Sequence, residues 1–185
     1  MDKIMVHYND PLAYKIMGET LSNFLNNNTI IVCVGTDKCI GDSLGPITGT
    51  ILKEKNFPLP VFGTVENPIH ALNIKVKMSE IASLYPNHNI IGIDACLGES
   101  NNIGFIQSRN YPIYPGKGVG KKLPHVGNHS IVGIVDSTEI NIFNNNSIRL
   151  NFILNMAKSI SHSIIYGFKL TCEKYILPNK NKAKT

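Results

Sequence analysis

The sequence predicts one α/β domain, a three-layer α/β/α sandwich that is doubly wound around a mostly parallel sheet. Residues 30–34 form a continuous apolar run rich in β-branched side chains, which is typical of a strand buried on both faces. Longer segments with apolar residues at helical spacing alternate with short runs of this kind. Folds of this class usually bind ligands beyond the carboxyl ends of their strands, so the functional residues are expected there.

Strands and helices are expected in turn along the chain. The strands are placed at residues 30–34, 61–65, 89–93, 104–106 and 131–135. The helices are placed from Pro11 to before Asn26, over 44–52, from Pro68 to before Pro86, and over 148–176. A loop rich in glycine and proline is expected over 111–124, and Gly167 marks a point where the last helix could divide into two.

Length and composition limit the class of protein. The 185 residues fit a single domain, which we place at residues 1–177, followed by a basic and flexible tail at 178–185. Hydrophobic residues make up 43% of the chain and charged residues 17%, which is enough apolar sequence for a buried core and excludes disorder or a coiled coil. The net charge is +5, but three lysines lie in the last six residues and the other basic residues are scattered. Nucleic acid is therefore not an expected partner.

Cysteine usage and hydropathy indicate a cytoplasmic protein. The four cysteines form no Cys-x-x-Cys pair, and Cys33 and Cys96 lie in apolar runs, where a free cysteine behaves as a small hydrophobic residue. The N-terminus has no basic region followed by an apolar stretch, and no segment reaches the ~18 apolar residues of a spanning helix. No membrane association is expected.

Two aspartates are candidates for catalysis. Asp42 lies in the loop after the strand at 30–34, and Asp94 lies at the end of the strand at 89–93, so both are expected at one edge of the sheet. Two carboxyl groups brought together share a proton, because like charges a few ångströms apart raise one pKa and leave the other group ionised. One group then acts as base and the other as acid. The alternative interpretation is structural, with Asp42 capping the next helix and Asp94 accepting backbone N–H groups in a turn.

Other motifs are less specific. Gly41-Asp42-Ser43-Leu44 matches a serine esterase signature, but the Asp-x-x-His that would supply the histidine base is absent, so Ser43 is not expected to be a nucleophile. The segment 115–122 fails the spacing of a phosphate-binding loop; it is either a surface loop or a lid whose amides and lysines bind a peptide or an oxyanion. Asp37 is an ordinary loop aspartate that we keep as a neighbour of the site.

Three histidines have a structural and a functional interpretation each. His125 and His129 flank Val-Gly-Asn in an expected loop, so their spacing does not place them on one helix face, and metal ligation is the lesser interpretation. His70 falls within the helix expected after Pro68, where a core or interface position comes first and substrate contact second.

Five motifs between about residues 30 and 135 carry a resemblance to a known family. They are Gly35-Thr36-Asp37, Gly41-Asp42-Ser43-Leu44-Gly45-Pro46, Gly63-Thr64-Val65-Glu66-Asn67-Pro68-Ile69-His70-Ala71, Ile93-Asp94-Ala95-Cys96-Leu97-Gly98 and Pro115-Gly116-Lys117-Gly118-Val119-Gly120. With them the chain resembles the YyaC family of spore proteases and, more distantly, the germination protease that degrades small acid-soluble spore proteins. That protease carries its catalytic aspartates in Asp-Ala-Leu-Gly-Pro and Ile-Asp-Ala motifs, which match Asp42 and Asp94. The implied fold is the phosphorylase/hydrolase-like fold of the hydrogenase maturation proteases.

The resemblance implies a sporulation-associated peptidase that hydrolyses peptide bonds with an aspartate pair and without metal or cofactor. Its substrate would be a protein or peptide, spore proteins included, in the cytoplasm of the forespore or mother cell; homo-oligomer formation stays open. The residues implied to contact substrate are Asp37, Ser43, Glu66, His70, Gly116, Lys117, Gly118 and Gly120. One alternative is a sporulation protein that binds peptides without cleaving them. The other is a maturation endopeptidase in which Asp42, Asp94 and either His125 or His129 hold nickel.

Overall fold

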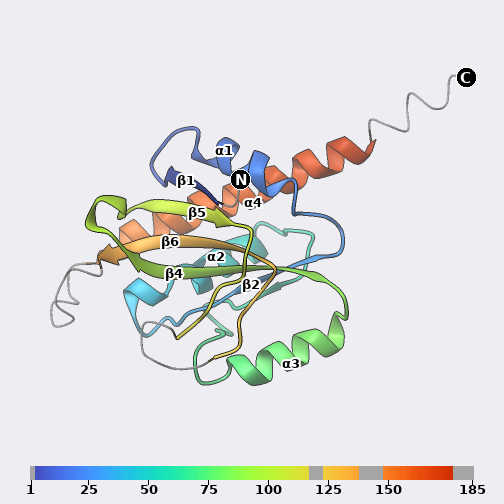
Figure 1. The fold of residues 1–185 in the computed structure, drawn as a ribbon, viewed down its shortest axis with the longest axis horizontal. Coiled ribbons are helices and arrows are strands. Elements are labelled where there is room, and N and C mark those ends of the chain that lie inside the picture. The colour runs from blue at the N-terminus through green and yellow to red at the C-terminus, as the bar shows by residue number, and fades with distance from the viewer. Residues whose placement is uncertain (1–2, 117–122, 138–147, 177–185) are drawn as a thin grey trace, which may run out of the picture.

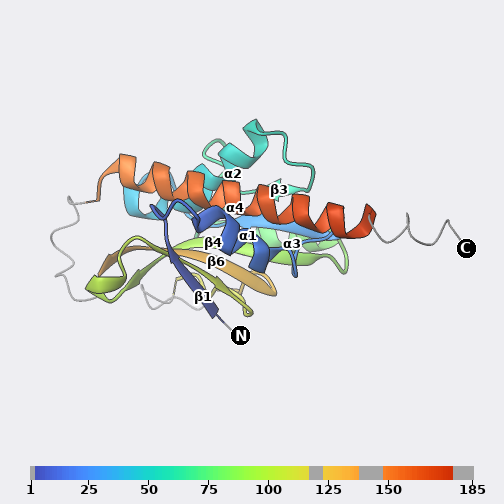
Figure 2. The same ribbon diagram turned by 90° about the horizontal axis from the view of Figure 1, so that it is seen from above.

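The computed structural model describes residues 3–116, 123–137 and 148–176. A central sheet lies between two layers of helices, as Figures 1 and 2 show from two directions. The strands are β1 (Lys3–His7), β2 (Thr29–Cys33), β3 (Val61–Phe62), β4 (Asn89–Gly98), β5 (Phe105–Arg109) and β6 (His129–Ser137). The α-helices are α1 (Ala13–Leu21), α2 (Leu44–Glu54), α3 (Ile74–Leu84) and α4 (Leu150–Ile176), and two short 3-10 turns are η1 (Ile40–Asp42) and η2 (Ser100–Asn102).

The six strands form one sheet in the order β1-β5-β6-β4-β2-β3. The pairs β2–β3, β2–β4 and β4–β6 are parallel, whereas β5 runs antiparallel to both of its neighbours, β1 and β6. The α/β sandwich with a mostly parallel sheet is thereby confirmed. No helix within the described residues is long and apolar enough to cross a membrane.

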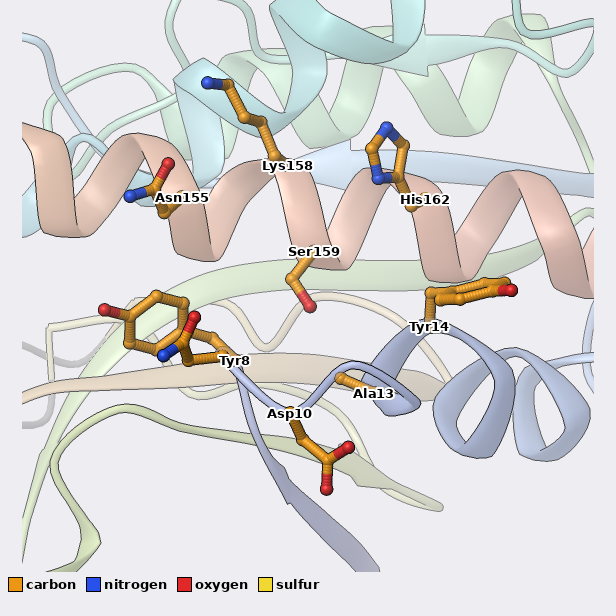
Figure 3. A pocket seen from close by; sticks show the side chains of 9 residues that line it. Tyr8, Asp10, Ala13, Tyr14, Asn155, Lys158, Ser159 and His162 are labelled. Carbon is orange, nitrogen blue, oxygen red and sulfur yellow. The ribbon is translucent and has the colours of Figure 1, made fainter.

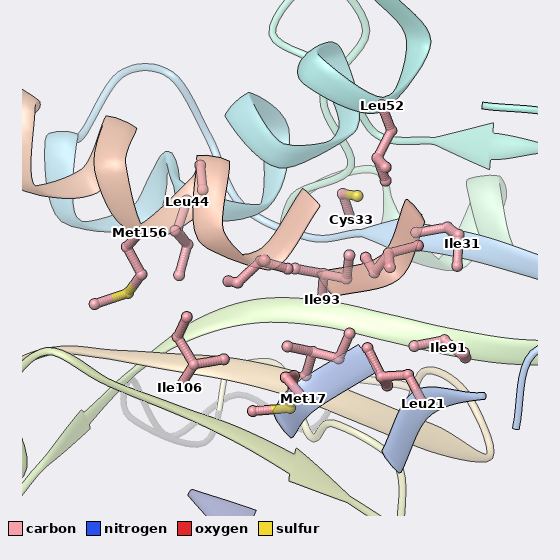
Figure 4. Packing of buried hydrophobic residues seen from close by; sticks show 14 of the residues in the cluster. Met17, Leu21, Ile31, Cys33, Leu44, Leu52, Ile91, Ile93, Ile106 and Met156 are labelled. Carbon is pink, nitrogen blue, oxygen red and sulfur yellow. The ribbon is translucent and has the colours of Figure 1, made fainter. Parts of the chain in front are cut away.

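Each face of the sheet carries its own hydrophobic core. On one face, Ile31, Cys33, Ile91 and Ile93 pack with residues of α1, α2 and α4, and Figure 4 shows Met17, Leu44 and Met156 reaching this cluster from the three helices. On the other face, Val32 and Val132 pack under Ile74 and Ile81 of α3. Because side chains alternate along a strand, β2 contributes to both cores, which explains its continuous apolar sequence.

Helices α1 and α4 approach closely at two glycines. A Cβ atom on Gly167 would lie 2.7 Å from the Gly18 carbonyl oxygen, and a Cβ on Gly18 would lie 2.7 Å from a ring carbon of Tyr166. α4 runs without a break from residue 150 to 176. Gly167 therefore marks a contact between helices and not a division of the last helix.

Several boundaries differ from the sequence-based prediction. The N-terminal strand β1 was not predicted, β4 continues five residues beyond Ile93 to Gly98, and β3 ends at Phe62. The first helix begins at Ala13, because the Asp10 carboxylate accepts the Leu12 N–H at 2.8 Å and holds residues 10–12 in a turn. The predicted tail at 178–185 lies outside the described residues.

The largest correction concerns residues 67–73, which were expected to be helical. Asn73, and not Asn67, precedes the first turn of α3, and its side chain accepts the His70 N–H at 2.9 Å and donates to the Pro68 carbonyl at 3.0 Å. Ile69 forms a parallel bridge with Val34. His70 consequently lies beside the carboxyl end of β2 and not on a helix.

Candidate active site

The loop after β2 places Asp42 at the carboxyl edge of the sheet. Gly35 has a φ of +138°, which an L side chain rarely adopts, and a Cβ there would collide with the Asp42 carbonyl oxygen. The Thr36 N–H donates to that same carbonyl at 3.0 Å and closes the loop. At the start of α2, a Cβ on Gly45 would collide with the Val34 carbonyl, so this glycine lets the helix pack directly on the end of β2. The glycines of the motif around Asp42 therefore fix the loop that holds its carboxyl group.

Asp94 lies one residue beyond the last β4 residue that pairs with β2. Cys33 is paired with Ile93, and the Val34 N–H donates to the Ile93 carbonyl at 2.7 Å. Ile93 points into the core under α1, α2 and α4, so alternation turns the Asp94 side chain to the face that carries α3. The Ala95 N–H donates to Asp94 Oδ1 at 2.8 Å, which fixes one carboxyl oxygen.

The two carboxyl groups affect one another. Burial raises the pKa of Asp94 well above its ordinary value of 3.8, the negative charge of Asp42 raises it further, and the Ala95 N–H and the Arg109 charge oppose the rise. Burial also raises the pKa of Asp42, and the Thr36 N–H and the nearby His70 lower it. Asp94 thus has the stronger tendency to keep a proton, while Asp42 has the stronger tendency to ionise.

His70 is fixed beside Asp42 by its own loop. The Leu72 N–H lies 3.3 Å from Nδ1 of His70 and donates to it, which holds the ring against its own loop. The Gly35 N–H donates to the Ile69 carbonyl at 2.8 Å and ties this loop to the loop that carries Asp42. The structure therefore brings together Asp42, Asp94 and one of the residues implied to contact substrate.

Arg109 of β5 is a charged neighbour of the pair that sequence reasoning missed. Its Nε atom donates to Gln107 Oε1 at 2.9 Å, a second guanidinium nitrogen donates to the same oxygen, and the guanidinium carbon lies 5.6 Å from the centre of the Tyr111 ring. Burial raises the pKa of the Cys96 thiol, and the charge of Arg109 and its hydrogen bond to the thiol oppose that rise. The only sequence signal was a lone arginine after a short apolar strand, and β5 was predicted to stop at residue 106.

Two comparisons with known proteins identify the family of this chain. The profile of a family described as "Protein of unknown function (DUF1256)" matches residues 5–163, which is most of the chain. The chain belongs to this family. It is also 38% identical over 168 residues to a Bacillus subtilis (strain 168) protein described as "Uncharacterized protein YyaC", with 88% of this chain and 82% of the relative covered. The matched region includes both aspartates, His70 and Arg109.

The resemblance also implies substrate contact for Asp37, Ser43, Glu66 and four residues of the segment 116–120. Ser43 is only 4% exposed and its hydroxyl donates to the Ile40 carbonyl at 2.7 Å, so it stabilises the loop. Asp37 and Glu66 are exposed. Gly116 is half-buried with a φ of +76°. Lys117, Gly118 and Gly120 lie outside the described residues.

Neither histidine suggested for nickel lies with the carboxyl pair. His129 pairs with Ile91 at the start of β6 and stacks on Phe24 at 3.9 Å, on the sheet face opposite to Asp94. His125 is exposed, with its ring 6.3 Å from that of Tyr114. Among residues 3–116, 123–137 and 148–176, no three side chains of His, Cys, Asp or Glu are grouped so as to hold a metal ion. The described donor set does not fit the nickel site of the alternative interpretation.

Two surface pockets lie away from the carboxyl pair. One, of about 360 Å³, lies between the β1–α1 turn and α4, and its lining includes Tyr8, Asp10, Ser159 and His162. In Figure 3, Lys158 and His162 point away from Asp10, so its charged groups do not converge on one ligand position. The other, of about 520 Å³, borders β3 at Phe57 and Phe62. Neither includes a residue of the candidate active site.

Proposed function

We propose that this protein is an aspartate-dependent peptidase that hydrolyses amide bonds in a protein or peptide substrate. The observation that carries the proposal is that Asp42 and Asp94 lie at the carboxyl ends of two adjacent parallel strands, where the charge of Asp42 raises the pKa of Asp94. Structural aspartates that cap helices or bind backbone amides normally have a lowered pKa. A pair of carboxyl groups whose pKa values are driven upward to different extents is suited to acid–base chemistry.

The two groups would take different parts in the reaction. Asp42, the more readily ionised, accepts a proton from a water molecule as the water oxygen attacks the carbonyl carbon of the scissile amide. Asp94, which keeps its proton, donates it to the amide nitrogen as the C–N bond breaks. The products are a carboxylic acid and an amine, and proton transfer from Asp42 to Asp94 restores the starting state. The Thr36 N–H and the nearby His70 support this assignment, because both lower the pKa of Asp42 and so favour its ionised form.

The resemblance to spore proteases supports the choice of substrate. We extend the proposal to a sporulation-associated peptidase that acts on spore proteins in the cytoplasm of the forespore or mother cell. A peptide-binding protein of sporulation without catalytic activity is the second candidate, because it would retain the same residues at this edge of the sheet. The experiment below separates the two.

The test is cleavage of proteins in a spore extract, followed by intact-mass and fragment analysis. The parent protein is compared with Asp42→Asn, Asp94→Asn and the control Asp136→Asn. Asp136 is a suitable control because its Oδ1 accepts the N–H of the next residue at 2.8 Å, as Asp94 does, but it lies on β6 beyond Val132, the residue that pairs with Asp94. We expect fragments with the parent and the control, and at least a hundredfold slower cleavage with either site variant. Equal cleavage by all four proteins would refute the pair mechanism, and binding of peptides without fragments would favour the second candidate.

A further inference from the structure

Arg109 is held in place more firmly than a surface arginine. Two nitrogens of its guanidinium share the Gln107 side-chain oxygen, and its flat face lies near the Tyr111 ring. Gln107 is only 3% exposed, and its own nitrogen lies 3.5 Å from the Met5 sulfur of β1. A guanidinium with this buried anchor keeps one orientation, because its planar fork loses few conformations on binding.

The register of the sheet places Arg109 on the same face as Asp94. Asp94 pairs with Val132 of β6, and Val132 pairs with Gln107 of β5, so the three residues form one row on the same face of the sheet. Arg109 lies two residues further along β5 and therefore on that face as well. The Arg109 guanidinium turns back to bond Gln107, which is the last residue of this row.

The composition of the chain makes the choice of arginine notable. The sequence contains 16 lysines but only two arginines, Arg109 and Arg149. Arg149 is exposed just before α4. Where a positive charge alone is needed, lysine is the usual residue in this protein, so an arginine at the pair indicates a need for the planar fork.

We propose that Arg109, anchored by Gln107, is the positioning residue that sets how tightly Asp94 holds the proton of the pair. This inference rests on the proposed function for its catalytic meaning. The guanidinium stabilises the ionised form of Asp94, so that the acid can release its proton during the reaction and does not remain permanently neutral. Among the described residues, the other charged group acting on Asp94 is Asp42 from the β2–α2 loop. The neighbouring Cys96 thiol of β4 is in turn affected by Arg109, Asp94 and Lys3 of β1.

The test is a carbon-13 NMR titration of the aspartate carboxyl groups. The chain contains only six aspartates, and loss of one signal in Asp94→Asn assigns Asp94. In Arg109→Gln we expect the Asp94 titration midpoint to rise by about one pH unit, because an opposite charge that favours the ionised carboxyl group is lost. Arg109→Lys keeps the charge without the fork and should give a smaller rise. The matched control Arg149→Gln should leave the midpoint unchanged.

Gln107→Leu tests the anchor separately from the charge. The midpoint should rise in this variant although Arg109 is still present, and the double variant Gln107→Leu with Arg109→Gln should rise no further than Arg109→Gln alone. An Asp94 midpoint that is the same in Arg109→Gln, Arg109→Lys and the Arg149→Gln control would overturn the proposal.

The outcome is separable from that of the cleavage experiment. If the parent protein cleaves no substrate but Arg109→Gln raises the Asp94 midpoint, the role of Arg109 stands and the peptidase proposal falls. If the parent cleaves and the midpoint does not move, the reverse holds. If both hold, the pH profile of cleavage by Arg109→Lys should shift toward higher pH on the limb that reports Asp94.

Discussion

Replacing Asp94 with asparagine should make the protein more stable at neutral pH. The pKa of Asp94 is raised on folding by burial and by the Asp42 charge. In the unfolded chain this carboxyl group ionises near its ordinary pKa of 3.8, whereas in the folded protein it resists ionisation. A raised folded-state pKa adds stability below about pH 3.8, and this stability is lost as the pH rises toward the folded-state pKa. Asparagine has no such ionisation, and its side-chain oxygen can still accept the Ala95 N–H.

The size of the effect follows from the width of this pH interval. Each pH unit over which the folded and unfolded states differ by one proton changes the free energy of unfolding by about 1.4 kcal/mol. Between pH 3.8 and pH 7 this sets a ceiling of about 4 kcal/mol. Because Asp94 is half-buried and the Arg109 charge opposes the shift, we expect Asp94→Asn to gain about 1–2 kcal/mol at pH 7.

Urea unfolding at several pH values measures this gain directly. The free energies of the parent and of Asp94→Asn should coincide near pH 3 and separate progressively above pH 4. Asp136→Asn, which keeps the same kind of local hydrogen bond, should show no such pH-dependent gain. An Asp94→Asn variant that is no more stable than the parent at pH 7 would show that Asp94 ionises freely in the folded protein, and the acid–base assignment would then be wrong.

Two further substitutions test the loop of Asp42 and the opposite face of the sheet. Gly35→Ala should lower the free energy of unfolding by about 2–4 kcal/mol, because φ is +138° and the new Cβ displaces the Asp42 carbonyl. The control Gly41→Ala should cost under about 1 kcal/mol in the same urea measurement, because its new Cβ meets only the end of a flexible isoleucine side chain. His129→Phe should gain stability relative to the parent as the pH falls below 6.5, because burial lowers the pKa of His129 and its protonation therefore destabilises the folded parent. Phenylalanine suits the position because Nδ1 of His129 has no partner among the described residues and the ring stacks on Phe24. Thermal unfolding at pH 5 and pH 7.5 measures this difference, and an equal effect at the two pH values would contradict it.

The sequence was informative where local chemistry and topology agree. Asp42 and Asp94 were predicted at one edge because each follows a buried strand, and parallel strands bring their carboxyl ends together. His70 was placed in a helix because Asn67-Pro68 looks like a helix start, but α3 begins only after Asn73, whose side chain bonds the His70 N–H and the Pro68 carbonyl and holds the segment before it as a loop. Nothing local distinguishes two asparagines six residues apart; the bridge from Ile69 to Val34 decides between them, and it is a long-range contact.

Arg109 could not be predicted for a different reason. Its relation to Asp94 depends on the register of two strand pairs, β4–β6 and β5–β6, and on the antiparallel direction of β5. A shift of one residue in either pair would turn the arginine or the aspartate to the other face of the sheet. Periodicity in a single sequence fixes neither register nor direction, so residues that meet across three strands are the ones that sequence reasoning misses.

The position of the pair also explains how one fold gives two carboxyl groups different tasks. From β2 the chain crosses through α2 to β3 on one side, and it then returns through α3 to β4 on the other side of β2. The β2–β4 boundary is therefore the point where successive connections pass on opposite faces of the sheet, and a crevice forms there in doubly wound folds. Asp42 lies at this boundary on a loop whose Thr36 amide and His70 favour its charge, whereas Asp94 lies there on a strand where burial disfavours its charge. The loop and the strand thus give the two carboxyl groups different pKa values, which suits Asp42 to act as base and Asp94 as acid. Arg109, from a third strand, limits the rise in the pKa of Asp94, so that this group remains able to release its proton.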